Sequence, residues 1–174
     1  MQKITDYETS RLKAERVLGK LDLAAVFKSV FPDYENHYKS TEKEDRAGTD
    51  YFVNCRSGMR KVDIKLMLKK SPWIGSRCDN LPVEYWSVKE RGIRGLEGDA
   101  DYVIWLYADT LRAVCAPRKQ LRNYIDRHRL EWTYFLSKGE SRTRLCSGYE
   151  YTSTFFWVPA WEIEKIGGGI LKVA

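Results

Sequence analysis

Two acidic residues and a lysine stand in neighbouring apolar segments of the chain. Asp50 interrupts the run 48–53, and one residue separates Asp63 from Lys65 in the run 62–67. Residues i and i+2 of a β-strand point to the same side, so Asp63 and Lys65 would share a face. If the two runs pair as an antiparallel hairpin, Asp50 can face that side too. Two carboxylates beside an ammonium group are the smallest set of functional groups that metal-assisted phosphodiester hydrolysis needs.

Each part of this pattern meets a requirement of that reaction. Hydrolysis needs an activated water, neutralised charge on the phosphoryl group and a stabilised leaving oxygen, and carboxylate-bound Mg²⁺ can supply all three. Mg²⁺ takes only one or two protein carboxylates and keeps several waters, which suits Asp50 and Asp63. The backbone carbonyl of Ile64 lies between the site residues and offers a further ligand. Lys65 would orient or help deprotonate the attacking water, or stabilise the transition-state charge.

A purely structural role fits the same residues. Acid-x-Lys triplets are common, and the charged face of a half-exposed strand has the same alternation. Three features favour a site. Asp63 and Lys65 lie within a strongly apolar run, and the two segments are adjacent in the sequence. Asp50 also interrupts an apolar run, where an acid is costly unless it is paired or bound to a metal.

The residues before these segments divide into two parts. Apolar residues recur at helical spacing over residues 5–31, and Gly19 or Asp22 is expected to break this stretch into two helices. Residues 33–46 are polar, without apolar periodicity, and predict a loop.

Strand-like runs dominate the remainder of the chain. A short Ser-Gly connector joins the two acidic runs and is typical of a hairpin. Strands are predicted at 48–55, 60–68, 83–88, 102–107, 111–116, 143–149 and 151–158, loops at 69–81 and 89–100, and helices at 117–125 and 159–164. We therefore expect one α/β or α+β domain over residues 1–174, with a mixed, mainly antiparallel central sheet flanked by helices.

Composition narrows the class of protein. The 174 residues suffice for one domain, and 43% hydrophobic residues provide a core. A net charge of +6 and a pI near 9.1 indicate an anionic partner such as nucleic acid. The four cysteines lack CxxC spacing, which predicts reduced thiols in a cytoplasmic protein. The sequence has no signal-peptide pattern and no run of 18 apolar residues, so no membrane partner is expected.

The acidic segments 46–53 and 62–65 together resemble the active-site signature of the PD-(D/E)xK nuclease superfamily. That superfamily includes many restriction endonucleases, junction resolvases and phage exonucleases. The resemblance spans about residues 5–125, and leaves a strand pair and helix in 126–174 outside it. It implies a restriction endonuclease-like core, with a helix, a three-stranded antiparallel meander, a helix and a further strand. Thr49 stands where the superfamily has a proline.

The resemblance also implies a role for each site residue. The two aspartates and the Ile64 carbonyl would bind Mg²⁺ or Mn²⁺, and Lys65 would be the catalytic lysine. Many members add a glutamate from the first helix, for which Glu15 is the best candidate and Glu8 the second. A solvated helix face would explain Glu15 as well.

Other charged residues could complete such a site. Glu84 is an acid within the predicted strand 83–88, and it could approach the metal if that strand pairs with 62–68. Otherwise Glu84 pairs with Lys65 or faces solvent. Basic residues that could contact a nucleic-acid backbone, with strongly salt-dependent binding, are Arg56, Arg60, Lys61, Lys69, Lys70, Arg77, Lys89, Arg91 and Arg94. A further basic cluster that begins at Arg118 could equally be a solvated face.

These patterns favour a Mg²⁺-dependent endonuclease that acts on DNA, of phage or mobile-element type. Cutting a duplex with one site per chain needs two chains, which would favour a homodimer. Two alternatives remain. One is a nuclease-like fold without catalysis that grips nucleic acid or blocks another protein, and the other is an interaction protein in which Asp50 pairs with Lys65. Only the nuclease predicts binding of Mg²⁺ or Mn²⁺ that Asp50→Ala abolishes.

Overall fold

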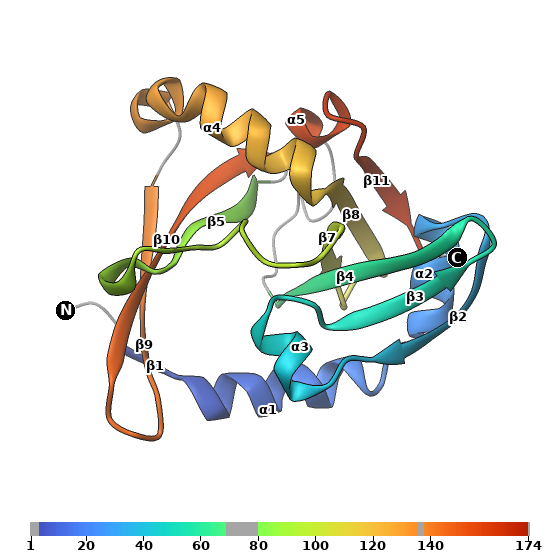
Figure 1. The fold of residues 1–174 in the computed structure, drawn as a ribbon, viewed down its shortest axis with the longest axis horizontal. Helices are drawn as coiled ribbons and strands as arrows, with labels where there is room; N and C mark the ends of the chain where they lie inside the picture. The colour runs from blue at the N-terminus through green and yellow to red at the C-terminus, as the bar shows by residue number, and fades with distance from the viewer. Residues whose placement is uncertain (1–3, 69–79, 136–137, 174) are drawn as a thin grey trace.

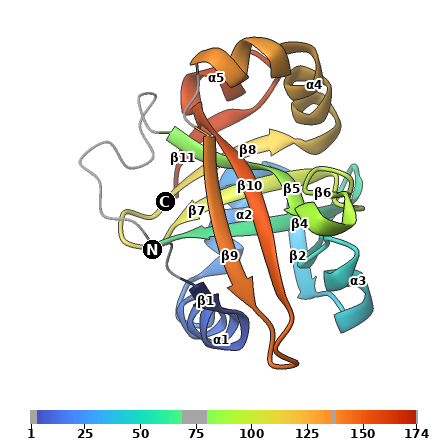
Figure 2. The ribbon, with the colours of Figure 1, turned by 90° about the vertical axis from the view of Figure 1, so that its left-hand side faces the viewer.

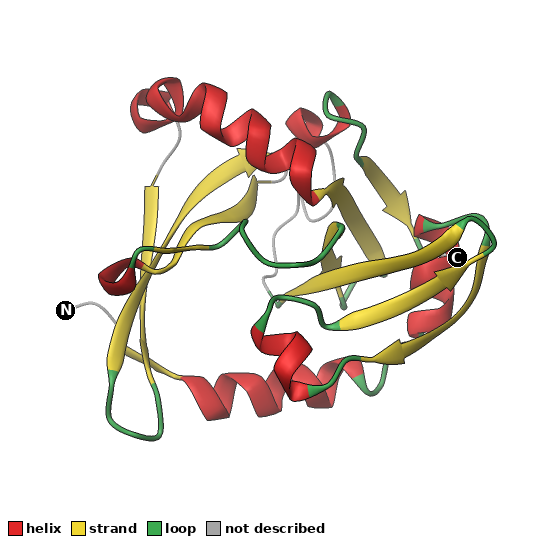
Figure 3. Cartoon of the chain, in the orientation of Figure 1, coloured by secondary structure: helices red, strands yellow, loops and turns green. Residues whose placement is uncertain are grey.

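The chain folds into helices packed around two β-sheets, as a computed structural model shows for residues 4–68, 80–135 and 138–173 (Figure 1). Figure 3 shows the same arrangement by type of secondary structure. The α-helices in these ranges are α1 (Tyr7–Leu18), α2 (Leu23–Val30), α3 (Glu42–Arg46), α4 (Arg118–Phe135) and α5 (Ala160–Glu164). In the part of the chain that the structure describes, no helix has the length and apolar character needed to span a membrane.

The larger sheet carries the predicted hairpin. Its strands are β2 (Tyr34–Lys39), β3 (Tyr51–Cys55), β4 (Gly58–Met67), β7 (Tyr102–Tyr107), β8 (Arg112–Pro117) and β11 (Gly169–Lys172). They lie in the order β11-β8-β7-β4-β3-β2. Only β4 and β7 run parallel, and the other neighbours in this sheet are antiparallel. The predicted mixed, mainly antiparallel sheet is therefore confirmed.

A second sheet lies across from the first, which corrects the expectation of one central sheet. Its strands are β1 (Ile4–Asp6), β5 (Asn80–Val88), β6 (Ile93–Arg94), β9 (Lys138–Arg144) and β10 (Glu150–Pro159), in the order β1-β9-β10-β5-β6. Figure 2 looks across β9 and β10, with β4 and β7 behind them. The second sheet forms because β5 pairs with β10 and not with β4.

Capping residues explain why the first helical stretch divides as predicted. Asp6 accepts a hydrogen bond from the Thr9 N–H and begins α1, and Asp22 accepts one from the Ala25 N–H and begins α2. These side chains satisfy backbone donors that have no partner within the helix. Buried residues of α2 then pack against one face of the larger sheet. The two predicted helices are thus confirmed.

Two predicted loops contain regular structure. Residues 33–46 form β2 and α3. The sequence pattern did not predict β2 because this largely exposed edge strand has no apolar face. The five-residue α3 is too short to show periodicity, and a capping box between Thr41 and Glu44 begins it. Residues 89–100 contain the 3₁₀ turn η1 (Lys89–Arg91) and the two-residue β6.

The space between the two sheets holds the larger apolar cluster. Trp105 of β7 and Leu81 of β5 are buried there, and Leu121 of α4 and Ile163 of α5 cover them. The Trp105 indole N–H also donates a 3.1 Å hydrogen bond to the Pro82 carbonyl of β5. Trp105 therefore joins the two sheets by both packing and hydrogen bonding.

We expect Trp105→Phe to lower the free energy of unfolding by about 2–4 kcal/mol, because it leaves a void and removes the donor to Pro82. Urea denaturation followed by circular dichroism measures the change. Trp161→Phe is the matched control, since Trp161 is 37% exposed, and it should cost less than about 1 kcal/mol. Equal losses in the two variants would contradict the bridging role of Trp105.

Candidate active site

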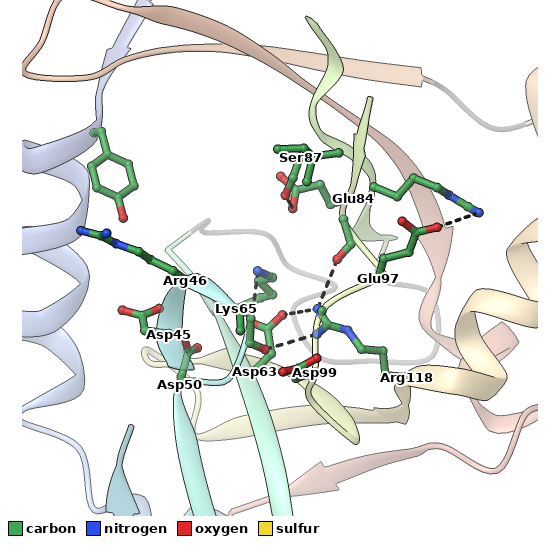
Figure 4. Close-up of a pocket in the computed structure, with 17 residues that line it drawn as sticks. Asp45, Arg46, Asp50, Asp63, Lys65, Glu84, Ser87, Glu97, Asp99 and Arg118 are labelled. Atoms are coloured by element: carbon green, nitrogen blue, oxygen red, sulfur yellow. Dashed lines mark hydrogen bonds and ion pairs between the residues drawn. The ribbon is translucent and has the colours of Figure 1, made fainter. Parts of the chain in front are cut away.

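The β3–β4 hairpin brings the predicted acids and lysine to one end (Figure 4). Its register places Tyr51 opposite Val62, which confirms the predicted antiparallel pairing. Asp50 directly precedes β3, and Asp63 and Lys65 follow Val62 in β4. All three therefore lie at the end of the hairpin away from its turn.

Asp50 is held against the edge of β4 by two hydrogen bonds. Its N–H donates to the Val62 carbonyl at 2.8 Å, next to the Tyr51–Val62 pair at the end of the hairpin. Its Oδ2 accepts the Ile64 N–H at 2.6 Å. The N–H and carbonyl of one strand residue lie on the same edge. The Ile64 carbonyl, a predicted ligand, is therefore on the edge that Asp50 occupies.

Asp63 is buried and contacts two cations. Its side chain is 4% exposed, with Oδ1 3.1 Å from Lys65 Nζ and Oδ2 2.8 Å from Arg118 Nη2. The negative charge of Asp63 is the main cause that raises the pKa of Lys65 above its usual range. Lys65 thus stays protonated, which favours charge stabilisation over proton abstraction among its predicted roles.

Arg118, the first residue of α4, is the site residue that the sequence prediction missed. Its side chain is 5% exposed and donates to the carbonyls of Gly48 and Gly95, each at 3.2 Å, besides Asp63. Glycine makes room for this guanidinium. A Cβ on Gly98 would lie 2.5 Å from Arg118 Nη1, and one on Gly48 would lie 3.1 Å away.

The expectation that Arg118 could belong to a solvated basic face is wrong. It begins a helix directly after Pro117, where the positive end of the helix dipole disfavours a cation. That placement is the signal in the sequence that could have singled it out. A basic residue at such a position needs a compensating acid, and Asp63 supplies it.

The site opens into a cavity of about 540 Å³ between the two sheets. The lining combines residues of β4 with Glu84 and Ser87 of β5, Arg94 of β6 and the loop that follows it. A second cavity, of about 370 Å³, extends beside α1. Both cavities are lined by Tyr7, Asp45 and Asp50. Asp50 therefore lies where the two cavities meet.

The two glutamates considered on the first helix differ in position. Glu15 lines the second cavity together with Asp50, and its carboxylate pairs with Arg11 at 3.1 Å and Lys39 at 3.2 Å. Glu8 also pairs with Arg11 at 3.1 Å and lines neither cavity. Of the two, Glu15 is the one placed near Asp50.

Glu84 reaches the site by another route than predicted. The pairing with β4 that would have brought it near the metal does not form, because β5 belongs to the second sheet. Glu84 nevertheless lines the larger cavity from the sheet opposite, and its charge contributes to the raised pKa of Lys65. Its carboxylate accepts a 2.7 Å hydrogen bond from the Ser87 hydroxyl.

The predicted nucleic-acid contacts are spread over the surface. Among those that the structure describes, only Arg94 lines the larger cavity. Arg56 and Arg60 lie near the turn of the β3–β4 hairpin, at the end opposite the acids. Lys61 is in β4, Lys89 pairs with Glu140, and Arg91 lies over the Tyr149 ring. Lys69, Lys70 and Arg77 lie outside the described residues.

The donor set fits a hard divalent cation such as Mg²⁺ or Mn²⁺. Asp50 and Asp63 supply carboxylate oxygens beside the Ile64 carbonyl. Burial and then the negative charge of Asp63 raise the pKa of Asp50 to about 7, an electrostatic strain that a bound cation would relieve. Within the described ranges no three or more His, Cys, Asp or Glu side chains group to hold a metal. An ion here would therefore use two carboxylates and complete its shell with water and substrate oxygens, as Mg²⁺ does.

Comparisons of the chain with protein-family models, curated proteins and solved structures find no match. The description of the site therefore rests on its geometry, in which two acids, a lysine and a buried arginine line one cavity.

The raised pKa of Asp50 predicts a pH-dependent stability. Its folded-state pKa of about 7 exceeds the ordinary 3.8, so the native state binds the extra proton between these values. The free energy of unfolding therefore falls as the pH rises through that window. Asp50→Asn keeps an acceptor for the Ile64 N–H, and should be more stable than wild type by about 2 kcal/mol at pH 8.

Urea denaturation in EDTA at pH 5 and pH 8 measures this difference. Asp109→Asn, in the exposed turn after β7, is the matched control and should follow wild type at both pH values. A gain for Asp50→Asn that is the same at pH 5 as at pH 8 would refute the assignment.

Removing Arg118 should be costly, because Arg118→Ala leaves the buried Asp63 without one of its two cations. We expect the free energy of unfolding to fall by about 3–5 kcal/mol. The exposed Arg127→Ala on the same helix should cost less than about 0.5 kcal/mol. The double variant Arg118→Ala with Asp63→Asn should cost less than the sum of the two single changes, and strict additivity would argue against direct coupling.

Proposed function

We propose that the protein is a metal-dependent nuclease of the PD-(D/E)xK type, which hydrolyses DNA phosphodiester bonds with Mg²⁺ or Mn²⁺. The observation that carries this proposal is the convergence of Asp50, Asp63 and Lys65 on one cavity at the end of one hairpin. The Ile64 backbone lies between them and is hydrogen-bonded to Asp50. Asp63 and Lys65 lie in β4 and Asp50 directly precedes β3, an arrangement that supports the resemblance.

Each residue then has a defined task. Asp50 and Asp63, with the Ile64 carbonyl, would hold the cation. When bound, the ion supplies Lewis-acid activation of a water and neutralises phosphoryl charge. Lys65 remains protonated beside Asp63 and stabilises charge that develops on the phosphoryl oxygens. Arg118 is a positioning residue, because it acts by fixing the carboxylate of Asp63.

The order of elements around the site supports the same proposal. The helix α2 precedes an antiparallel meander of β2, β3 and β4, and β7 continues the sheet beside β4 in parallel. One element of the superfamily core departs from this order. Between β4 and β7 the described residues form β5, η1 and β6 in place of the superfamily's helix.

A second candidate function is a nuclease-like module that binds nucleic acid without cutting it. The observation that favours it is the state of Asp63, whose two oxygens already contact Lys65 and Arg118. Such a network is satisfied without a metal, and a cation would have to replace the Lys65 contact to reach Oδ1. Metal binding and cleavage therefore separate the two candidates.

Cleavage of plasmid and single-stranded DNA with Mg²⁺ or Mn²⁺ tests the proposal. We expect Asp63→Asn and Lys65→Ala to lower the rate about 100-fold or more, since each removes charge that the transition state requires. Asp109→Asn and Lys28→Ala, which change an exposed acid and an exposed lysine away from the cavity, should cut like wild type.

Three outcomes decide between the candidates. Cleavage that EDTA abolishes and that both site variants lose supports the nuclease. Cleavage that persists in EDTA or in Asp63→Asn overturns it. If folded wild type retains DNA in a gel shift but cuts no substrate, the binding module is supported instead.

A further inference from the structure

The two cavities adjoin at Asp50. The larger lies between the sheets, the smaller runs beside α1, and Tyr7, Asp45 and Asp50 line both. A polymer that entered one cavity and left by the other would pass directly over the Asp50 carboxyl. A phosphate at that point would lie beside the residues proposed to hold the metal.

The recessed position of Asp63 favours one form of substrate. Asp63, one of the two acids proposed to bind the metal, lies on the lining of the larger cavity, which holds about 540 Å³. Asp63 has a side chain that is 4% exposed, so a phosphate reaches it only by entering the cavity. An unpaired strand can bend its backbone into such a recess, whereas a duplex is stiff, with a persistence length of about 50 nm.

We propose that the site acts on unpaired nucleic acid, and that a single strand runs through both cavities with its phosphate at Asp50. This inference rests on the proposed nuclease function and adds the class of substrate to it. It also assigns a binding role to Tyr7, which neither the motif nor the resemblance singles out.

Tyr7 is placed to receive a base. It is the first residue of α1, it is 40% exposed, and it lines both cavities. An exposed aromatic ring beside a backbone path is the usual platform on which a base of a single strand stacks, whatever its sequence. A duplex keeps its bases stacked on one another and gains nothing from such a ring.

Acids outnumber cations on this lining, and cations lie on both sides of Asp50. Arg46 and Arg94 lie in the larger cavity, and Arg11 and Lys39 in the smaller. Each of these four pairs with at least one acid that is more than a third exposed. Ion pairs of this kind contribute little to stability. The four cations can therefore leave their acids and pair with phosphates of a nucleic-acid backbone, whatever the base sequence.

Fluorescence anisotropy with a labelled single-stranded oligonucleotide and a hairpin duplex of matching sequence tests the inference. Ca²⁺ replaces Mg²⁺, and gel electrophoresis confirms that the probes stay intact. We expect the single strand to bind about ten-fold more tightly than the duplex. Tyr7→Ala should weaken single-strand binding about ten-fold and leave duplex binding unchanged. Tyr38→Ala is the matched control, because Tyr38 is 49% exposed and lines neither cavity.

Equal or tighter binding of the duplex would overturn the inference, and so would a folded Tyr7→Ala variant with wild-type affinity for the single strand. Parallel cleavage assays separate this result from the proposed function. Metal-dependent cutting of duplex as fast as of single strands refutes the single-strand preference and leaves the nuclease intact. Tyr7-dependent single-strand binding without metal-dependent cutting supports the binding path and refutes the nuclease.

Discussion

The buried charge of Asp63 is the constraint on which the rest of the site depends. A carboxylate with a 4% exposed side chain is costly unless cations and donors compensate it. Lys65 does so from the same strand, and Arg118 does so from the start of α4. Because Arg118 also binds the carbonyls of Gly48 and Gly95, this one carboxylate ties α4, the hairpin and the segment after β6 to a common point.

The two cations that compensate the charge of Asp63 do not contact the second acid, Asp50, in the same way. Lys65 and Arg118 both contact Asp63, while Asp50 receives the Ile64 N–H and keeps a pKa near 7. Two cations therefore compensate the charge of Asp63, whereas the charged form of Asp50 is disfavoured. Asp50 lies where the two cavities adjoin, and solvent, a cation or a phosphate can reach it there. This difference between Asp63 and Asp50 favours a ligand-binding site over a purely structural ion pair.

The parts of the site that the sequence predicted are those that short-range rules control. Strand periodicity and a short connector suffice to place Asp63 and Lys65 on one face and Asp50 beside them. Arg118 is 55 residues from Asp63, and Glu84 reaches the cavity from the opposite sheet. Neither contact can be read from spacing, because each depends on which strands pair. The same limit explains why one sheet was expected where two form.

The inner face of β4 shows why the cavity exists at all. Val103 and Trp105 of β7, on the same side of the sheet, pack into the apolar cluster between the sheets, whereas β4 offers Asp63 and Lys65. Charged side chains are costly to bury in a dry apolar core, so a cavity lies between the sheets here. Apolar residues at these positions would give a better-packed and more stable core. A chain that keeps charges there departs from the packing rule at one place, and such departures are expected at functional sites.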